Sequence, residues 1–225
     1  AGGFFHYLDD DGSVYDNSRH LVNSTRMVFC HALAYRFNGK EEHRDAVRHG
    51  LKFLQDQHWQ ANYGGYAWVL EDGKPVDRTQ HCYGLAFVLL AYAHAFDIGV
   101  DEARAHIGTT FGHMEKLFWS EQHGLYADEA TPEGLVSPYR GQNANMHSCE
   151  ALLAAYEATG ETRYLHRAER LARNITVRQA ALANGWIWEH YTADWKIDWE
   201  YNRHDNTNMF RPWGYQPGHM TEWAK

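Results

Sequence analysis

Apolar residues recur along three pairs of segments with the spacing of a buried helix face. This periodicity predicts helices over residues 21–37 and 41–57, 79–96 and 101–119, and 143–159 and 161–179. Gly39, Gly99 and Gly160 close the first segment of each pair, where a residue in the left-handed conformation commonly ends a helix. The pattern therefore indicates an all-α chain built from helix pairs.

Similar glycine-aromatic signals recur at intervals of roughly sixty residues, which indicates an internal repeat. The four signals are Gly3-Phe4-Phe5, Gly65-Tyr66-Ala67, Gly124-Leu125-Tyr126 and Gly185-Trp186-Ile187. A short aromatic stretch with a turn follows each second helix, and Asp72-Gly73 in GGYAWVLEDGKPV favours a small hairpin or an irregular loop. Such helix-helix-loop units either stack as an open solenoid or close into a ring of inner and outer helices.

The first helix of each pair carries polar residues near its start although most of its residues are apolar. These polar residues are Arg26, His81, Tyr83, Asn143 and His147. In a ring the starts of the inner helices converge on one central cavity, whereas a solenoid gives such residues no common role. The sequence therefore favours a ring.

Pro217 and Gly218 begin the inner helix of a fourth unit, because proline is well tolerated at the first helical position. The chain opens on the loop that should follow a helix pair, and closing a ring takes more units than residues 1–225 supply. We therefore expect a single domain over residues 1–225 that is a fragment, lacking the first helices and the C-terminal third or more. Assembly with a second chain is the alternative.

Composition excludes several classes of protein. Among 225 residues 44% are hydrophobic, and the net charge of -8 comes without a basic run, which argues against nucleic-acid binding. The longest apolar run, around residues 85–96, is interrupted by His94 and is too short to span a bilayer, so we expect a cytoplasmic protein without a membrane partner. The nine Trp and fourteen Tyr suit either stacking on a sugar ring or packing between helices.

Three cysteines at wide spacing do not form a disulfide framework. Cys30, Cys82 and Cys149 lie within apolar helical runs. We expect them to be reduced residues of the core.

Two His-x-x-Glu pairs, His147 with Glu150 and His219 with Glu222, each share one face of an inner helix. A histidine salt-bridged in the core is the plainest interpretation, and a metal site is disfavoured because neither HExxH nor paired CxxC is present. Acid-base chemistry fits better. His219 lies in the first helical turn, where the positive end of the dipole keeps an imidazole neutral and ready to accept a proton. Glu222 then orients that ring or accepts a hydrogen bond from a sugar hydroxyl.

Arg26 lies within NSTRMVFCHALA among residues that would otherwise be core, so its charge needs a partner. We favour a substrate oxygen over a structural carboxylate. Arg140 and Arg211 each precede an inner helix and also fit as loop anchors. Trp213 and Tyr83 are stacking platforms or packing residues, and the sequence leaves both interpretations open.

Three segments, NSTRMVFCHALA, RGQNANMHSCEALLAAYEATGE and FRPWGYQPGHMTEWAK, resemble the N-acylglucosamine 2-epimerase superfamily, and the resemblance covers essentially the whole chain. The ending PGHMTEWAK is most similar to its aldose-ketose isomerase branch. The resemblance implies an (α/α)6 barrel, incomplete here, that interconverts an aldose with its ketose through a cis-enediol, with no metal and no cofactor. Mannose and fructose are the expected sugars, and the partner is then a small monosaccharide.

The resemblance also assigns roles to residues. It makes His219 one of two histidines that move a proton between C1 and C2, and it puts the second one outside residues 1–225. His147 then binds near the ring oxygen or O1, Arg26 polarises the oxygens, and Glu222 completes the catalytic set. The expected substrate-binding residues are Asn143, Tyr83, Trp213 and Arg211.

Four alternatives stay open. The first is a sugar 2-epimerase of the N-acylglucosamine or cellobiose type, and the second is a sulfoquinovose isomerase. The third is an (α/α)6 glycoside hydrolase, which would need a pair of carboxylic acids such as Glu150 and Glu222. The fourth is a sugar-binding protein without catalysis. A homo-oligomer is left open as well, and residues 1–225 alone are expected to show little or no activity.

Overall fold

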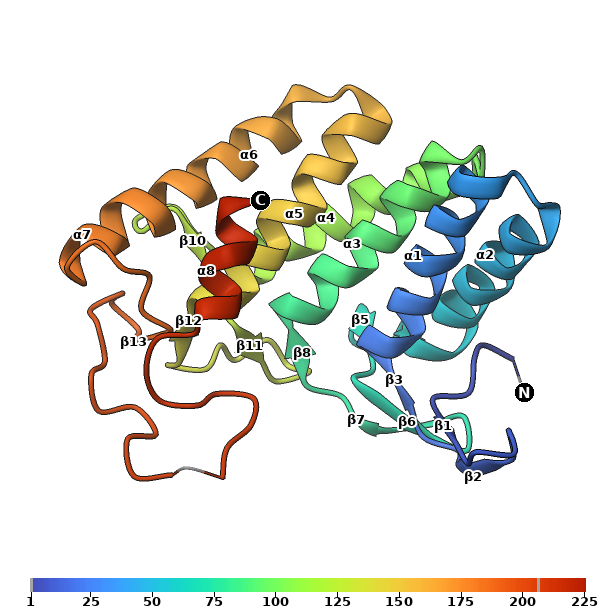
Figure 1. Ribbon diagram of the computed structural model, residues 1–225, viewed down its shortest axis with the longest axis horizontal. Coiled ribbons are helices and arrows are strands. Elements are labelled where there is room, and N and C mark those ends of the chain that lie inside the picture. Colours follow the sequence, from blue (N-terminus) through green and yellow to red (C-terminus); the bar gives the residue numbers. More distant parts are fainter. Residues whose placement is uncertain (1, 206) are drawn as a thin grey trace.

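The computed structural model describes residues 2–205 and 207–225, and this part of the chain is mainly α-helical (Figure 1). Long helices alternate with connections that contain short strands. The helices are α1 (Leu21–Asn38), α2 (Glu41–Phe53), α3 (Cys82–Asp97), α4 (Ala103–Phe118), α5 (Gln142–Thr159), α6 (Thr162–Arg173), α7 (Ala180–Leu182) and α8 (Pro217–Ala224). Two π-helical segments, Leu54–His58 and Asn174–Gln179, extend α2 and α6.

The strands are short and pair antiparallel in small ladders at one end of the helices. They are β1 (Tyr7–Leu8), β2 (Val14–Asp16), β3 (Arg19–His20), β4 (Trp59–Gln60), β5 (Gly65–Tyr66), β6 (Val69–Glu71), β7 (Lys74–Asp77), β8 (Gln80–His81), β9 (Trp119–Ser120), β10 (Leu125–Tyr126), β11 (Glu129–Ala130), β12 (Arg140–Gly141) and β13 (His190–Tyr191). β6 and β7 form the hairpin expected at Asp72-Gly73, where both residues have positive φ.

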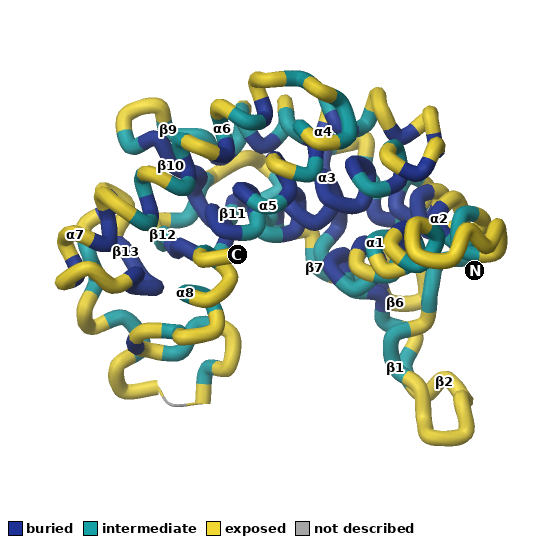
Figure 2. The backbone as a smooth tube through the Cα atoms, turned by 45° about the horizontal axis from the view of Figure 1, so that its top comes forward, coloured by how far each residue is buried: buried dark blue, intermediate teal, exposed yellow. Residues whose placement is uncertain are grey.

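Helices α1, α3, α5 and α8 are consecutive neighbours, and α2, α4 and α6 each pack behind the helix that precedes them. In Figure 2 the chain follows an arc, with α1, α3, α5 and α8 toward its concave side. The helix pairs and the fourth inner helix that the sequence predicted are therefore present. The starts of the inner helices all face the end of the molecule that carries the strands (Figure 1).

Helix α3 is buried almost all round because it contacts α1 and α5 at its sides and α4 behind. Its sequence CYGLAFVLLAYAHAFD is correspondingly apolar on every face. Helices α2 and α6 cover the outside and bury only one stripe, which includes Val47 and Leu51 in α2 and Ala168 and Leu171 in α6. Helix α3 is thus enclosed by its neighbours, whereas α2 and α6 keep one face toward solvent.

The helix ends agree closely with the periodicity. Gly39 and Gly160 adopt φ of 69° and 72°, and each donates its N–H to a carbonyl in the last turn of α1 or α5. The expected start of α3 at residue 79 is wrong, because Gln80–His81 forms β8 and pairs with β11. Cys30 was expected in the core and is exposed, whereas Cys82 and Cys149 are buried thiols.

No helix in the described part of the chain is both long and apolar enough to cross a membrane.

Candidate active site

The inner helices α1, α3 and α5 are each tied at their first residue to the connection that follows the next outer helix. A backbone carbonyl from that connection accepts the N–H of the first helical residue, and the adjacent residues pair as strands. The three bonds are Leu21 to Trp68 (2.9 Å), Cys82 to Asp128 (2.8 Å) and Gln142 to Glu189 (3.1 Å). The repeat therefore brings Trp68, Asp128 and Glu189 to equivalent positions beside the starts of α1, α3 and α5.

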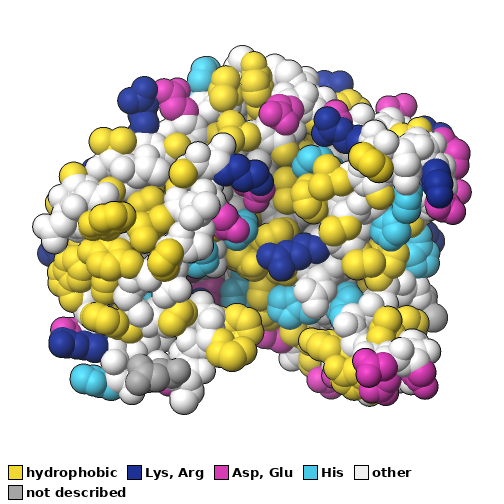
Figure 3. Space-filling model, viewed as in Figure 1, with side chains coloured by type: hydrophobic (Ala, Val, Ile, Leu, Met, Phe, Trp, Pro, Cys, Tyr) yellow, Lys and Arg dark blue, Asp and Glu magenta, His cyan; other side chains and the backbone are white. Residues whose placement is uncertain are grey.

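A cavity of about 810 Å³ opens where these helix starts meet, within the size range of small-molecule sites. On the face drawn in Figure 3, histidine and basic side chains gather around this hollow. Five of the residues predicted from the sequence line it: Arg26, Tyr83, Asn143, Arg211 and His219. The cavity therefore joins residues from all four repeat units.

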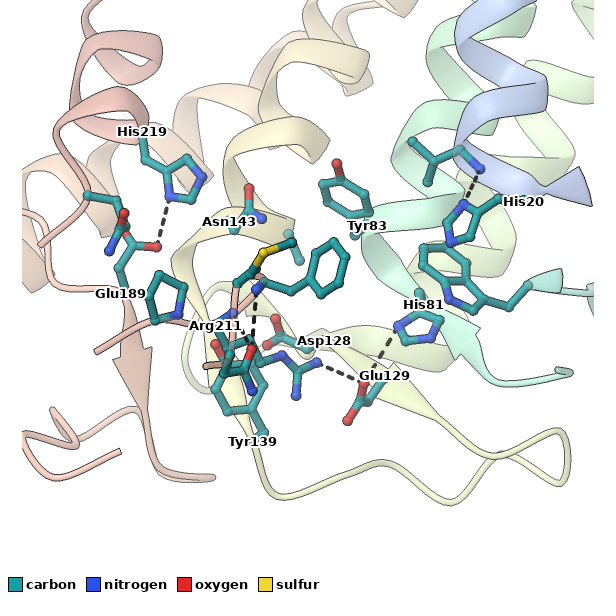
Figure 4. Close-up of a pocket in the computed structure, with 18 of the residues that line it drawn as sticks. His20, His81, Tyr83, Asp128, Glu129, Tyr139, Asn143, Glu189, Arg211 and His219 are labelled. Atoms are coloured by element: carbon teal, nitrogen blue, oxygen red, sulfur yellow. Dashed lines mark hydrogen bonds and ion pairs between the residues drawn. The ribbon is translucent and has the colours of Figure 1, made fainter. Parts of the chain in front are cut away.

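His219 is held by a buried carboxylate from another segment. Its Nδ1 lies 2.9 Å from Oε2 of Glu189, which is only 4% exposed, and the other ring nitrogen faces the cavity (Figure 4). Gln142, which is fully buried, donates its amide N–H to both Glu189 oxygens at 3.0 and 3.1 Å and accepts a bond from the indole N–H of Trp223. Nδ1 is therefore the donor to Glu189, which leaves Nε2 free toward the cavity.

The surroundings of His219 act against the neutral ring that the helix dipole was expected to favour. The hydrogen bond that His219 donates to Glu189 raises the pKa of His219 against the opposing effect of burial. A dipole at a helix start contributes about 0.3–1 kcal/mol, less than a hydrogen-bonded carboxylate at 2.9 Å supplies. The residue that orients the ring is thus Glu189, while the carboxylate of Glu222 points to His147.

Arg26, Tyr83 and Asn143 line a further part of the cavity wall. The Arg26 guanidinium donates to the Tyr83 hydroxyl at 3.3 Å and lies over the Phe87 ring, 4.7 Å from its centre. Among the described residues no carboxylate pairs with it. Asn143 has a buried side-chain oxygen that accepts no hydrogen bond in the described structure. The Arg26 guanidinium and the unsatisfied amide oxygen of Asn143 can therefore each bind a polar group of a ligand.

An ion pair between Arg211 and Glu129 forms the floor of the cavity, with 2.8 Å between a guanidinium nitrogen of Arg211 and Oε2 of Glu129 (Figure 4). Arg211 also lies over the ring of Tyr139, 4.0 Å from its centre. Nδ1 of His81 is 3.6 Å from Glu129, but burial lowers the pKa of His81 to about 4, so this ring is neutral near pH 7. Next to the pair, burial raises the pKa of the Asp128 carboxyl to about 7 although it accepts the N–H of Gly141 at 2.6 Å.

Three of the expected site residues are not among those that line the cavity: His147, Glu222 and Trp213. The His147 ring packs against Tyr83 and lies 3.4 Å from Glu150 and 4.0 Å from Glu222. It therefore sits just beyond the wall that Tyr83 forms. Trp213 packs edge-on against Trp188 and donates to the carbonyl of Trp199, so its contacts in this structure are those of a loop-packing residue.

The sequence interpretation missed Asp128, Glu129 and Glu189. A signal for two of them was present, because Asp128 follows Tyr126, and Glu189 follows Ile187, at the same distance of two residues within the repeat. Arg140, by contrast, was expected as a loop anchor, and its guanidinium donates to the carbonyls of Ser137 and Tyr139.

No group of three or more histidine, cysteine or acidic side chains in the described chain is arranged to hold a metal ion.

Comparison with known proteins decides the family. The model of the N-acylglucosamine 2-epimerase (GlcNAc 2-epimerase) family matches residues 3–225. The chain belongs to this family. A D-mannose isomerase of Marinomonas mediterranea is 54% identical over 227 residues, which cover 100% of this chain and 57% of that protein.

Solved structures of family members share the fold. A crystal structure of D-mannose isomerase superposes with a TM-score of 0.96 at 53% identity, over 99% of this chain and 57% of that one. The cellobiose 2-epimerase of Bacillus thermoamylovorans has a TM-score of 0.80 at 19% identity, over 88% of this chain and 55% of its own. The expected (α/α)6 barrel class is thereby confirmed. The chain spans little more than half the length of these relatives.

Proposed function

We propose that this chain is part of a metal-independent aldose-ketose isomerase that converts D-mannose to D-fructose. The observation that carries the proposal is the orientation of His219, whose Nδ1 is bonded to Glu189 while its Nε2 faces the cavity that Arg26 and Asn143 also line. Proton transfer between adjacent carbons needs a base beside the sugar and a cation near its oxygens. The similarity to proteins named D-mannose isomerase supports this choice of sugar.

In the proposed reaction, Nε2 of His219 removes the proton from C2 of the open-chain aldose. The C2–H electrons form the C1–C2 double bond, and the carbonyl oxygen at C1 gains a proton, giving the cis-enediol. The proton then returns to C1 while the hydroxyl at C2 loses its proton and becomes the ketone, so the sugar is neither oxidised nor reduced overall. Arg26 stabilises the developing charge on the oxygens, and the amide oxygen of Asn143 accepts a hydroxyl.

Five further residues keep supporting roles in the proposal. Tyr83 and Arg211 contact the substrate, His147 with Glu222 supports ring opening from behind Tyr83, and Trp213 reaches the sugar only if its loop rearranges. Glu189 raises the pKa of His219. The reaction should therefore become faster as the pH rises through this raised pKa, because the ring then loses its proton and can act as a base. A pH-rate profile that is flat across this interval would contradict His219 as the base.

The test compares this chain with a hybrid in which the chain replaces the matching stretch of the Marinomonas mediterranea protein. Each is incubated with D-mannose in D₂O and followed by NMR, which distinguishes fructose from the 2-epimer glucose. The proposal is supported if the hybrid forms fructose and if His219→Gln in the hybrid abolishes this activity. Glucose as the main product would make the protein a 2-epimerase, and release of an aglycone from an aryl glycoside would make it a hydrolase.

We further propose a cytoplasmic location. Two buried thiols, Cys82 and Cys149, and an exposed one, Cys30, are all unpaired, as is usual where thiols stay reduced. Recovery of the protein in an oxidising extracellular fraction would contradict this.

A further inference from the structure

At the floor of the cavity the charge of Arg211 is already paired with a carboxylate. Arg211 comes from the loop before α8, Glu129 from β11, and their side chains meet at 2.8 Å with 30% and 23% of their surfaces exposed. Stacking on Tyr139 fixes the plane of the guanidinium. Of the arginines among the described residues that line the cavity, Arg26 and Arg211, only Arg211 has a carboxylate partner.

The two titratable neighbours of the pair, His81 and Asp128, do not compete with Arg211 for Glu129. His81, the other neighbour of Glu129, is kept neutral by burial, which lowers its pKa to about 4. Asp128 adds further negative charge beside the pair above pH 7, where its carboxyl ionises. An anion that displaced Glu129 from Arg211 would leave that carboxylate half-buried, beside a second acid and without a cation. The floor therefore resists an incoming negative charge although it contains an arginine.

We propose that Glu129 determines charge specificity at the cavity floor: by holding Arg211 in an ion pair, it keeps the floor from binding an anionic substituent, so that a sugar is accepted when the group it places there is neutral and rejected when that group is a phosphate or a sulfonate. That the ligand is a sugar rests on the proposed function, whereas the exclusion of an anionic group from the floor does not. The inference uses a repulsive element, which is a common source of specificity between similar ligands. It also disfavours a sulfoquinovose isomerase for this chain.

Isothermal titration calorimetry with inorganic phosphate and with D-mannose 6-phosphate tests the proposal on the full chain. Glu129→Gln keeps the size of the side chain and frees the Arg211 charge, so it should bind both probes at least about tenfold more tightly than the wild type. The double variant E129Q/R211M should lose this gain. Glu133→Gln removes one charge from an exposed loop position and should change neither affinity.

Each outcome decides the matter. Equal phosphate affinity in Glu129→Gln and wild type overturns the proposal, as does tight binding by the wild type that Arg211→Met removes. Glu129→Asp, which retains the charge, should stay as weak as the wild type, and thermal unfolding shows that each variant is folded. Turnover of D-mannose by the hybrid is measured on the same variants. A gain in phosphate binding without any turnover would uphold the charge filter and refute the isomerase.

Discussion

His147 and His219 each begin a His-x-x-Glu pair on an inner helix, but their rings meet different partners. His147 contacts its own Glu150 at 3.4 Å, and that carboxylate is 43% exposed. His219 contacts Glu189, thirty residues away along the chain, through a side chain that is only 5% exposed. The spacing of a motif therefore places a histidine on a helix face, while the surrounding loops decide what chemistry the ring can do.

The largest expected difference between the two histidines is in turnover. In the hybrid protein, His219→Gln should lower kcat for D-mannose by about 10²–10⁴-fold, because the base is lost. His147→Gln should lower kcat by about tenfold at most, because a ring outside the cavity wall acts indirectly. Equal losses in the two variants, measured by NMR of fructose formation, would erase the distinction.

The second difference lies in the carboxylate behind each ring. Glu189→Gln should lower the pKa of His219, measured by NMR titration of the ring protons, and should lower kcat about tenfold. Glu222→Gln is the control and should leave the pKa of His219 nearer to its wild-type value, since Glu222 makes no hydrogen bond to that ring in the described structure. A larger fall in the pKa of His219 with Glu222→Gln than with Glu189→Gln would mean that Glu222, and not Glu189, raises this pKa.

The same variant has a predictable effect on stability. Since the pKa of His219 is raised in the folded state, its pair with Glu189 stabilises the fold fully below the pKa of an unfolded histidine, about 6.5. This stabilisation is lost as the pH rises through the raised value. Glu189→Gln should therefore lower the free energy of unfolding, measured with urea, by about 1.5–3 kcal/mol at pH 5.5 and by less at pH 9. A cost that grows with pH would contradict the ion pair.

How much of this site could be predicted follows from the same comparison. The helix pairs, α8 and the convergence of Arg26, Asn143 and His219 were predictable because a helical period is local and an inner helix start is recognisable. Glu129 and Glu189 lie in or next to short strands, whose two-residue ladders leave no alternating pattern of apolar residues, so only the long repeat marks the position of Glu189. Their partners are 82 and 30 residues away, so only the folded chain reveals the pairs.

Gln142, which holds the carboxylate of Glu189, should contribute less to stability than Glu189 itself. Gln142→Met removes the amide that bonds both Glu189 oxygens and the indole of Trp223, and it should destabilise the protein by about 1–3 kcal/mol. Gln179→Met is a matched control, since Gln179 is also buried but its amide oxygen has no partner in the described structure and its one donated bond is long at 3.4 Å. Equal costs in urea unfolding would remove the special role of Gln142.

The smallest effect is expected at the exposed pair. Glu150→Gln should cost about 0.2–1 kcal/mol at pH 7, because a carboxylate that is 43% exposed keeps most of its hydration. The hydrogen bond from His147 lowers the pKa of Glu150, so this stabilisation exists above the unfolded value, about 4.3, and is lost as the pH falls through the lowered one. Urea unfolding should thus show the cost of Glu150→Gln vanishing toward pH 3. The cost of Glu189→Gln instead grows as the pH falls toward 5.5, and parallel trends for the two variants would mean that the histidines share one environment after all.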